Sequence, residues 1–286
     1  MKKSKYIVNQ DYFKTVNEKS AYIIGFIMGD GNIGKNNSNN YYLQIRIHKQ
    51  DVEILEFIRD ELSPNRPLIF NQTKQKSGKI SECVCLKITS NQLCQDLIKY
   101  GVVERKSGKE QISCIPQKYL PDFLRGYFDA DGSLAIKKNK KYILSYVCAN
   151  KDFLVKIQEY FGVGKIENGH GRCYTYYVSK LDEILKIGNI IYNGNFYLKR
   201  KKDRFDNMPK RNKYIAFGEI KTLTEWSRDK RCVVHKDTLL YRINNTSLSM
   251  EESITTPPKQ KNGNMYLRQK TKTRKHCKNN YNPIGE

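Results

Sequence analysis

Two short stretches of the chain are apolar at nearly every position, and they are copies of one pattern. The first runs from Ile23 to Gly31, and the second runs from Leu124 to Gly132, 101 positions later. Each predicts a helix of about ten residues, about 15 Å long, that ends at its glycine. Ser20 is a suitable N-cap for the first helix. Because both stretches are apolar on most sides, we expect both helices to be buried.

The residues after the first stretch alternate between apolar and polar, which is the period of a strand. Within residues 41–48 every second side chain from Leu43 onward is apolar. An amphipathic helix follows from Asp51, then a strand over 84–88 and a helix that Ser90 caps. Together with a short strand directly after the first helix and one before residue 84, this half predicts the order αββαββα.

The second stretch is followed by the same series of patterns. A hairpin begins at 134–136 and returns over 142–149, an amphipathic helix starts at Asp152, and a strand (174–178) and a helix (181–191) complete the unit. We therefore predict an α+β fold, in which two pseudo-symmetric αββαββα repeats form a saddle of antiparallel sheets.

Composition changes after the second repeat, and this change sets the predicted domain boundaries. We assign residues 1–110 to the first repeat and 111–205 to the second. Residues 213–257 predict a small all-α module of the helix-turn-helix kind, with helices that begin after Thr222, at Lys236 and after Ser249. Residues 258–286 are basic and poor in apolar side chains, so we expect them to be disordered.

The net charge narrows the class of partner. The chain has 52 Lys and Arg against 29 Asp and Glu, a formal charge of +23. Such a surplus predicts a polyanionic partner, most often nucleic acid. No apolar run reaches the roughly 18 residues of a membrane span, and the N-terminus lacks a signal core, so we expect a cytoplasmic or organellar protein without a membrane partner. The spacings of the eight cysteines match no zinc framework.

Each apolar helix carries an aspartate, Asp30 or Asp131, just before its terminal glycine. A carboxylate at a helix C-terminus is disfavoured by roughly 0.3–1 kcal/mol unless a cation joins it. Small residues spaced by four allow two helix backbones to approach, and each helix has such a pair. If the helices pack in parallel, the two aspartates lie side by side and a divalent cation becomes the natural partner. The pairs are Gly25 with Gly29, and Gly126 with Ala130.

The duplicated segment resembles the motif of the LAGLIDADG homing endonucleases. The match is a glycine at the third position, glycine or alanine at the seventh, and Asp-Gly at the eighth and ninth, in both copies; Met28 departs from the acid at the sixth. The resemblance implies a helix pair at a pseudo-twofold axis and a monomer. It also implies Mg²⁺, with Mn²⁺ or Ca²⁺ as other occupants, bound by Asp30 and Asp131 and by the carbonyls of Gly29 and Ala130. A pair of glycine-rich core helices with solvated aspartates is the alternative.

The resemblance also implies basic residues beside each metal site. Lys106 and Lys201 lie at matching ends of the two repeats and are the candidates for stabilising charge on the phosphate or activating water. A solvated or phosphate-contacting lysine is an equally open interpretation. By the same resemblance, Lys49 and Asn150 at matching strand ends are candidates for positioning water.

The outward faces of the two sheets are the predicted DNA-reading surface. Strands can enter the major groove, where Arg pairs with guanine and Asn or Gln with adenine. Because the two faces differ, the target should be asymmetric. The alternation places these residues outward: Asn32, Asn36, Gln44, Arg46, His48 and Lys87 in the first repeat, and Ser133, Lys137 and Ser145 in the second.

The pattern of residues 221–257 resembles the helix-turn-helix modules appended to phage-borne homing endonucleases. In that interpretation the helix over 236–243 recognises DNA, and a packing module without DNA contact is the alternative. The DNA-binding candidates on it are Lys236, Thr238, Tyr241 and Arg242.

Taken together, the pattern and the resemblance predict a monomeric homing endonuclease that takes part in intron homing. It would make a double-strand break with short 3′ overhangs at a long asymmetric site in double-stranded DNA. Two alternatives share the scaffold: a DNA-binding regulator that has lost cleavage, and an RNA maturase that binds intron RNA.

Overall fold

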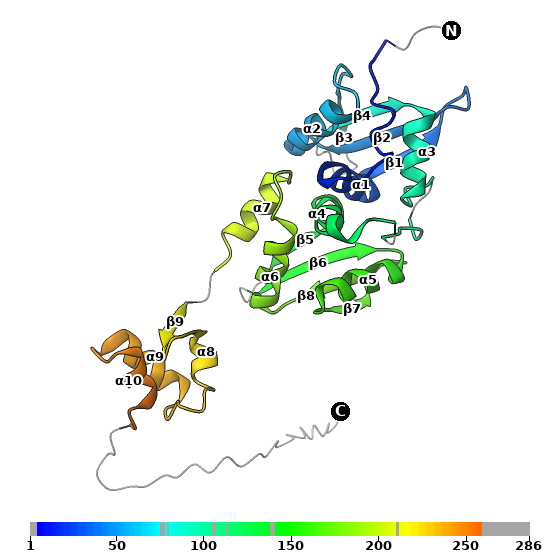
Figure 1. The fold of residues 1–286 in the computed structure, drawn as a ribbon. Coiled ribbons are helices and arrows are strands. Elements are labelled where there is room, and N and C mark those ends of the chain that lie inside the picture. The colour runs from blue at the N-terminus through cyan, green and yellow to red at the C-terminus, as the bar shows by residue number, and fades with distance from the viewer. Residues whose placement is uncertain are drawn as a thin grey trace, which may run out of the picture. The chain divides into compact units, whose positions relative to one another are not determined.

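The computed structural model describes residues 5–74, 78, 80–104, 107–112, 114–137, 141–209 and 212–258, with the backbone alone of 73 and 74. The chain divides into two compact units, Met1–Met208 and Pro209–Glu286, here called the core unit and the C-terminal unit (Figure 1). The predicted basic tail lies outside the described residues except for Pro258.

The first half of the core unit has the predicted order of elements. Alternation and helical periodicity placed them correctly because each half-buried element shows its own period. Val84, Leu86 and Ile88 are buried, as are the alternate residues of β2 that begin at Leu43. The elements are α1 (Glu18–Asp30), β1 (Gly31–Lys35), β2 (Tyr41–His48), α2 (Val52–Leu62), β3 (Ile69–Lys74), β4 (Ile80–Thr89) and α3 (Asn91–Lys99).

The second half repeats that order, which confirms the predicted α+β fold of two αββαββα repeats. Each half holds a four-stranded antiparallel sheet, and the strand orders β1-β2-β4-β3 and β5-β6-β8-β7 are equivalent. The elements are α4 (Leu120–Asp131), β5 (Ser133–Ile136), β6 (Tyr142–Cys148), α5 (Lys151–Phe161), β7 (Lys165–Asn168), β8 (Tyr174–Val178), α6 (Leu181–Ile191) and then α7 (Lys199–Asp206).

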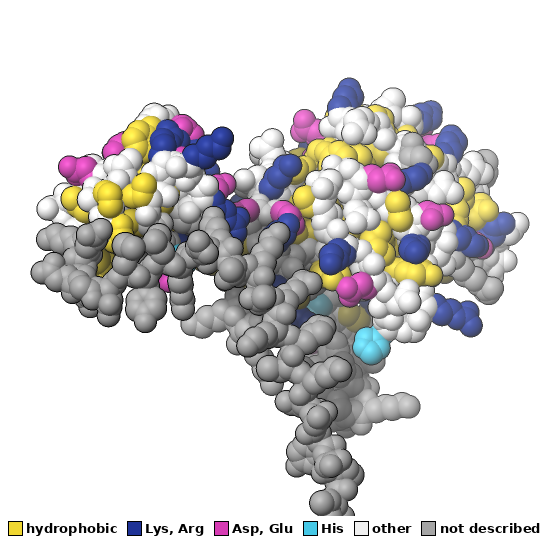
Figure 2. All heavy atoms as spheres, turned by 90° about the horizontal axis from the view of Figure 1, so that it is seen from below, with side chains coloured by type: hydrophobic (Ala, Val, Ile, Leu, Met, Phe, Trp, Pro, Cys, Tyr) yellow, Lys and Arg dark blue, Asp and Glu magenta, His cyan; other side chains and the backbone are white. Residues whose placement is uncertain are grey.

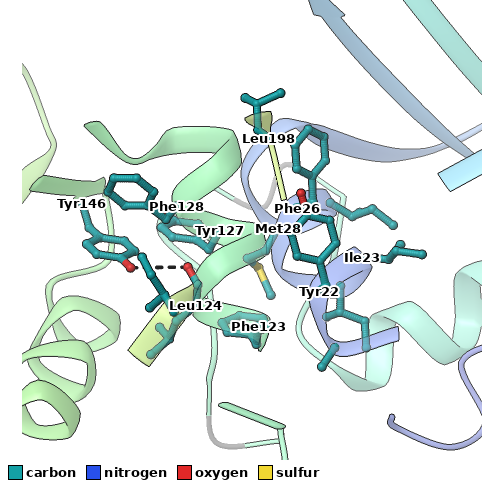
Figure 3. Packing of buried hydrophobic residues seen from close by; sticks show 14 of the residues in the cluster. Tyr22, Ile23, Phe26, Met28, Phe123, Leu124, Tyr127, Phe128, Tyr146 and Leu198 are labelled. Atoms are coloured by element: carbon teal, nitrogen blue, oxygen red, sulfur yellow. Dashed lines mark hydrogen bonds between the residues drawn. The ribbon is translucent and has the colours of Figure 1, made fainter. Parts of the chain in front are cut away.

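The two motif helices, α1 and α4, lie side by side between the sheets of the two halves (Figure 1). Both are buried along nearly their whole length, as their apolar sequence predicts. Aromatic side chains of both helices pack into the surrounding hydrophobic core (Figure 3). The Tyr146 hydroxyl of β6 donates a hydrogen bond to the Leu124 carbonyl of α4 at 3.4 Å. The prediction that Ser20 caps α1 is wrong: Asn17 is the N-cap, and Ser20 completes a capping box with it three residues later.

The C-terminal unit contains a hairpin as well as helices, so the prediction of a wholly helical module is wrong in this respect. Its small core gathers around Trp226, which is fully buried and donates its indole N–H to the Tyr214 carbonyl at 2.9 Å. The capping boxes at Thr222 and Ser249 begin two helices as predicted. The elements are β9 (Lys213–Ala216), β10 (Glu219–Thr222), α8 (Leu223–Trp226), α9 (Lys236–Asn245) and α10 (Met250–Thr255).

Within the described part of the chain, every helix is too short or too polar to cross a lipid bilayer.

Candidate active site

The two motif helices approach until backbone atoms of one meet the other. A Cβ placed on Gly25 would lie 2.0 Å from the carbonyl oxygen of Phe123, and one placed on Gly126 would lie 2.0 Å from that of Tyr22. No side chain larger than hydrogen fits at either point. The structure thus places both glycines at the contact between α1 and α4, where the spacing of small residues predicts them.

The same approach brings the two motif aspartates to one end of the helix pair. A Cβ on Gly29 would lie 2.4 Å from the Cβ of Ala130 and 3.2 Å from Oδ2 of Asp131. The Asp131 carboxylate therefore reaches the residue that precedes Asp30. Both aspartates are exposed, although the helices that they end are buried. Two carboxylates at the negative ends of two helices form a strong attractor for a cation.

Among the described residues, Lys201 is a basic residue that reaches this end of the helix pair. It lies in α7, is 7% exposed, and its ammonium donates to the carbonyls of Phe128 (2.7 Å), Gly132 (2.7 Å) and Ala130 (3.2 Å). A helix leaves its last carbonyls without intrahelical partners, so the ammonium satisfies the end of α4 on both sides of Asp131.

Burial and nearby charges act in opposite directions on Lys201. Burial lowers the pKa of Lys201 to about 8, because the ammonium loses its hydration. The charge of Asp129 opposes this lowering of the pKa, Arg200 adds to it, and Asp30 and Asp131 both oppose it. The ammonium therefore lies within electrostatic reach of both motif aspartates.

Asp129 is a site residue that the sequence did not single out. It is 2% exposed, and its carboxylate accepts hydrogen bonds from the hydroxyls of Tyr22 (2.9 Å) and Tyr192 (2.8 Å) and from the N–H of Leu198 (2.7 Å). Burial raises the pKa of Asp129 to about 6, against the lowering effect of these hydrogen bonds and of Lys201. The available signal was a carboxylate inside an apolar helix, where a charge is costly unless it is bonded.

A second link joins α7 to the other half of the core unit. Arg200 makes a two-pronged ion pair with Asp51, with Nε–Oδ1 at 2.6 Å and Nη2–Oδ2 at 2.7 Å. The Asp51 side chain is only 9% exposed, so this pair is partly shielded from water. The helical pattern predicted Asp51 only as the start of a helix, because its partner lies 149 residues away.

The other candidates for catalysis and water positioning have less direct placements. Lys106 lies outside the described residues. Lys49 approaches Glu82 at 3.4 Å on the surface. Asn150 caps α5, accepting from the Asp152 N–H at 3.0 Å, and its amide donates to the Glu110 carbonyl at 2.9 Å. Both polar ends of Asn150 are therefore used within the fold.

The strand register gathers most of the predicted DNA-facing residues of the first half. Asn32 of β1 lies opposite Gln44 of β2, which lies opposite Lys87 of β4. Arg46 and His48 follow on the same face, and both are exposed. Asn36 lies in the turn after β1, where its side chain accepts from the N–H groups of Ser38 and Asn40, each at 3.0 Å.

The corresponding face of the second half carries different side chains. Ser133 lies opposite Ser145, and Ser145 lies opposite Tyr177. Lys137 is exposed just beyond β5. Among the described residues visible in Figure 2, Lys and Arg side chains are spread among Asp and Glu side chains.

In the C-terminal unit, the structure corrects one predicted DNA contact. Arg242 is 8% exposed, and its guanidinium donates to the carbonyls of Ser253 (3.0 Å), Thr256 (2.6 Å) and Pro257 (3.2 Å). It therefore binds the end of α10 inside the unit, because those carbonyls need donors there. Lys236 and Tyr241 are exposed on α9, and Thr238 is half-buried.

The oxygen ligands available at the two aspartates suit a hard divalent cation. They are carboxylate and carbonyl oxygens, which Mg²⁺, Mn²⁺ and Ca²⁺ prefer. Among the described residues no group of three or more His, Cys, Asp or Glu could hold a metal alone. Mg²⁺ in particular is commonly held by one or two carboxylates plus substrate phosphates. Two aspartates from the protein are therefore enough when the substrate supplies the other ligands. The Ala130 carbonyl, a predicted ligand, already accepts from Lys201.

Comparison with known families gives one domain match in each half. Residues 19–77 match the WhiA LAGLIDADG-like domain, and residues 119–181 match the LAGLIDADG-like domain. Each match includes one motif helix and the first strands after it. The C-terminal unit lies outside both matches.

Similar proteins of known sequence include an uncharacterized protein, MJ0398, of Methanocaldococcus jannaschii. It is 24% identical over 202 residues, which span 66% of this chain and 70% of that protein. A DNA polymerase of Thermococcus hydrothermalis is 32% identical over 120 residues, 41% of this chain but only 7% of the polymerase.

Similar solved structures include I-SmaMI bound to uncleaved DNA in the presence of calcium ions and the LAGLIDADG meganuclease I-AabMI bound to uncleaved DNA. The first is 15% identical with a TM-score of 0.44 and covers 67% of this chain and 89% of that one. The second is 16% identical with a TM-score of 0.45 and covers 66% and 87%. Both TM-scores lie below 0.5.

Proposed function

The chain belongs to the LAGLIDADG family and carries its motif twice, and from that premise we propose that it is a site-specific, divalent-metal-dependent DNA endonuclease. The proposed product is a double-strand break with short 3′ overhangs at a long asymmetric target. The proposed enzyme is a monomer, since one chain already holds both copies of the motif, and it would act in intron homing.

One observation carries this proposal: two exposed aspartates lie at the same end of two buried helices that pack on each other. A Cβ on Gly29, the residue before Asp30, would lie 3.2 Å from Asp131 Oδ2, closer than an ordinary van der Waals contact. The contact between the helices is made by the small residues Gly25, Gly29, Gly126 and Ala130, and both aspartates are exposed beside it. A function that brings a cation to a phosphate explains both acids at once.

The carboxylates of Asp30 and Asp131 and the carbonyl of Gly29 would hold Mg²⁺. The Ala130 carbonyl already accepts a hydrogen bond from Lys201, so it would contribute less. The ion, when bound, would supply positive charge that stabilises the charge growing on the phosphate. Lys201 adds its own positive charge at the end of α4, next to the Asp131 carboxylate. Lys106 is proposed for the equivalent place beside Asp30 on the basis of its position in the repeat.

Substrate binding is proposed for the outward faces of both sheets. The row Asn32–Gln44–Lys87 and the exposed Arg46 and His48 offer donors and acceptors that match base edges in the major groove. The row of serines on the second half has neutral hydroxyls instead. Such unequal faces support an asymmetric target, and Lys236 and Tyr241 of the C-terminal unit are proposed as further contacts.

A cleavage assay with a library of DNA sites tests the proposal directly. We expect double-strand cutting in Mg²⁺ and binding without cutting in EDTA. Asp30→Asn and Asp131→Asn should each abolish double-strand cutting while binding in EDTA persists. Double-strand cutting at the wild-type rate by both variants would exclude the metal assignment.

A DNA-binding regulator without cleavage is the second candidate function. It is favoured by the match of residues 19–77 to a WhiA-type domain, a type that is non-catalytic. The same assay separates the two functions, because a regulator would bind one site tightly in both Mg²⁺ and EDTA and cut in neither. An RNA maturase would instead prefer structured intron RNA over every DNA site in a competition experiment.

A further inference from the structure

Asp129 connects three parts of the core unit that are far apart in sequence. Its own helix, α4, ends at Asp131, and its carboxylate accepts from Tyr22 of the other motif helix. It also accepts from Tyr192, at the end of α6, and from the backbone of Leu198, the N-cap of α7. One buried carboxylate thus bonds to the other motif helix, to the end of α6 and to the start of α7.

The hydrogen bonds continue from Asp129 to Lys201 and return to α4. The Leu198 N–H donates to Asp129, and the Leu198 carbonyl accepts from the Lys201 N–H at 2.9 Å. The Lys201 ammonium then donates to the carbonyls of Phe128 and Gly132, on either side of Asp131. The ring of contacts closes on the helix from which it starts, so the position of Lys201 depends on the carboxylate of Asp129.

The first copy of the motif shows that packing does not demand an acid here. Met28 occupies the position that corresponds to Asp129, and it is 1% exposed in the apolar core. A buried carboxylate costs desolvation that a thioether does not, and replacing buried polar groups by apolar ones is often neutral for stability. The acid in the second copy therefore calls for a reason other than packing of the helix pair.

We propose that Asp129 is a positioning residue that holds Lys201 beside Asp131, and that it serves the cleavage of one DNA strand only. The inference rests on the proposed endonuclease activity with one site for each strand. Met28 has no carboxylate with which to place a lysine in the same way, so the strand served by Asp30 should not depend on Asp129.

Nicking of a supercoiled plasmid that carries the target tests this proposal with the full chain. Asp129→Met copies the residue of the first motif. We expect it to accumulate nicked circles, with one strand cut at the wild-type rate and the other slowed on the order of 100-fold, as for a catalytic group displaced by about 1 Å. The slowed strand should be the one that Lys201→Met slows, identified with strand-specific end labels. The Kd for target DNA in EDTA should be unchanged.

The matched control is Asp122→Asn. Asp122 is also a buried acid of α4, but it pairs with Arg125 at 2.6 Å and has no bond to Leu198 or Lys201. We expect any loss of activity in this variant to slow both strands equally. If Asp129→Met fails to unfold cooperatively, Asp129→Asn takes its place; its amide oxygen can still accept from Leu198, and a smaller slowing of the same strand is expected.

Amine labelling provides a readout that needs neither metal nor cleavage. In the wild-type protein, buried Lys201 should react with an acylating reagent far more slowly than exposed Lys199, as mapped by mass spectrometry. Asp129→Met should raise the Lys201 rate at least tenfold while Asp122→Asn leaves it unchanged.

Equal slowing of both strands, or an unchanged Lys201 labelling rate, would overturn the positioning role. A wild-type protein that cuts no DNA would refute the endonuclease and with it the strand-specific part, whereas the labelling result would still decide whether Asp129 holds Lys201.

Discussion

Gly25 of α1 lies against the backbone carbonyl of Phe123 in α4, and a Cβ at Gly25 would fall 2.0 Å from that oxygen. Gly126 has the reciprocal relationship with Tyr22. Each glycine faces backbone atoms of the opposite helix, so a side chain added there could be accommodated only if a whole helix moved. The distance between the two helices is therefore set by the absence of a side chain at each glycine, and the same packing brings Asp30 and Asp131 to one end of the helix pair.

We predict that Gly25→Ala and Gly126→Ala each lower the free energy of unfolding by about 3 kcal/mol, the upper end of overpacking costs. Helix propensity alone predicts the opposite sign, a gain of about 1 kcal/mol for Gly→Ala. Urea unfolding of the full chain measures the difference. Gly188→Ala is the control: its new Cβ would meet the ring of Phe205, a side chain and not backbone, so its loss should be smaller. Stabilisation by Gly25→Ala would contradict the close approach.

Local patterns predicted most of the fold because most half-buried strands and helices of the core unit carry their own period. The alternation within β2 and the apolar stretches of α1 and α4 needed no knowledge of distant residues. Asp30 and Asp131 could be paired because the motif occurs twice. The helix pair and the position of its aspartates could therefore be predicted from the sequence.

The contacts that organise Lys201 could not be read in the same way. Asp129 meets Leu198 across 69 positions, and Arg200 meets Asp51 across 149, so no local period connects them. The hairpin of the C-terminal unit was missed for another reason. Its two-residue turn, Phe217-Gly218, has positive φ at both residues, and Phe is an uncommon choice there compared with Asn or Asp.

The ion pair between Arg200 and Asp51 should stabilise the attachment of α7 to the first half. We predict that Arg200→Gln lowers the free energy of unfolding by about 1–3 kcal/mol, because it leaves a mostly buried carboxylate without its charged donors. Removing the surface pair Lys202–Asp206 by Lys202→Gln should cost no more than about 0.5 kcal/mol. A double-mutant cycle with Asp51→Asn measures the coupling, and a coupling near zero would refute the link.

Acid should weaken the C-terminal unit through Asp229. Its carboxylate accepts from Lys221 (2.7 Å) and from Arg231 Nε (2.8 Å), and these hydrogen bonds hold the pKa of Asp229 far below its usual range. A depressed pKa in the folded state gives stability that is present above the usual value of about 4 and is lost as the pH falls below it.

We therefore predict that Asp229→Asn lowers the Tm of the C-terminal unit at pH 7. The difference in Tm between this variant and the wild type should decrease steadily as the pH falls below about 4. Thermal unfolding followed by the fluorescence of Trp226, the only tryptophan of the chain, reports on this unit. Asp237→Asn, at a carboxylate that is 85% exposed, should leave the Tm unchanged at every pH. A gap that stays constant down to pH 2 would show that the carboxylate charge plays no part.

Arg242 and Tyr241 are neighbours on α9 with opposite expected roles. Arg242 binds three carbonyls at the end of α10, whereas the Tyr241 side chain is 62% exposed. We predict that Arg242→Gln lowers the Tm of the C-terminal unit because the buried carbonyls lose charged donors. Tyr241→Ala should leave the Tm unchanged and weaken binding to the target DNA.

Lys236→Ala should also leave the Tm unchanged. It should reduce the slope of log K for DNA against log salt concentration by about 1, as expected when one phosphate contact is lost. Salt titrations of DNA binding and tryptophan-detected melting separate the three variants, and an unchanged DNA affinity in both Tyr241→Ala and Lys236→Ala would show that α9 packs without contacting DNA.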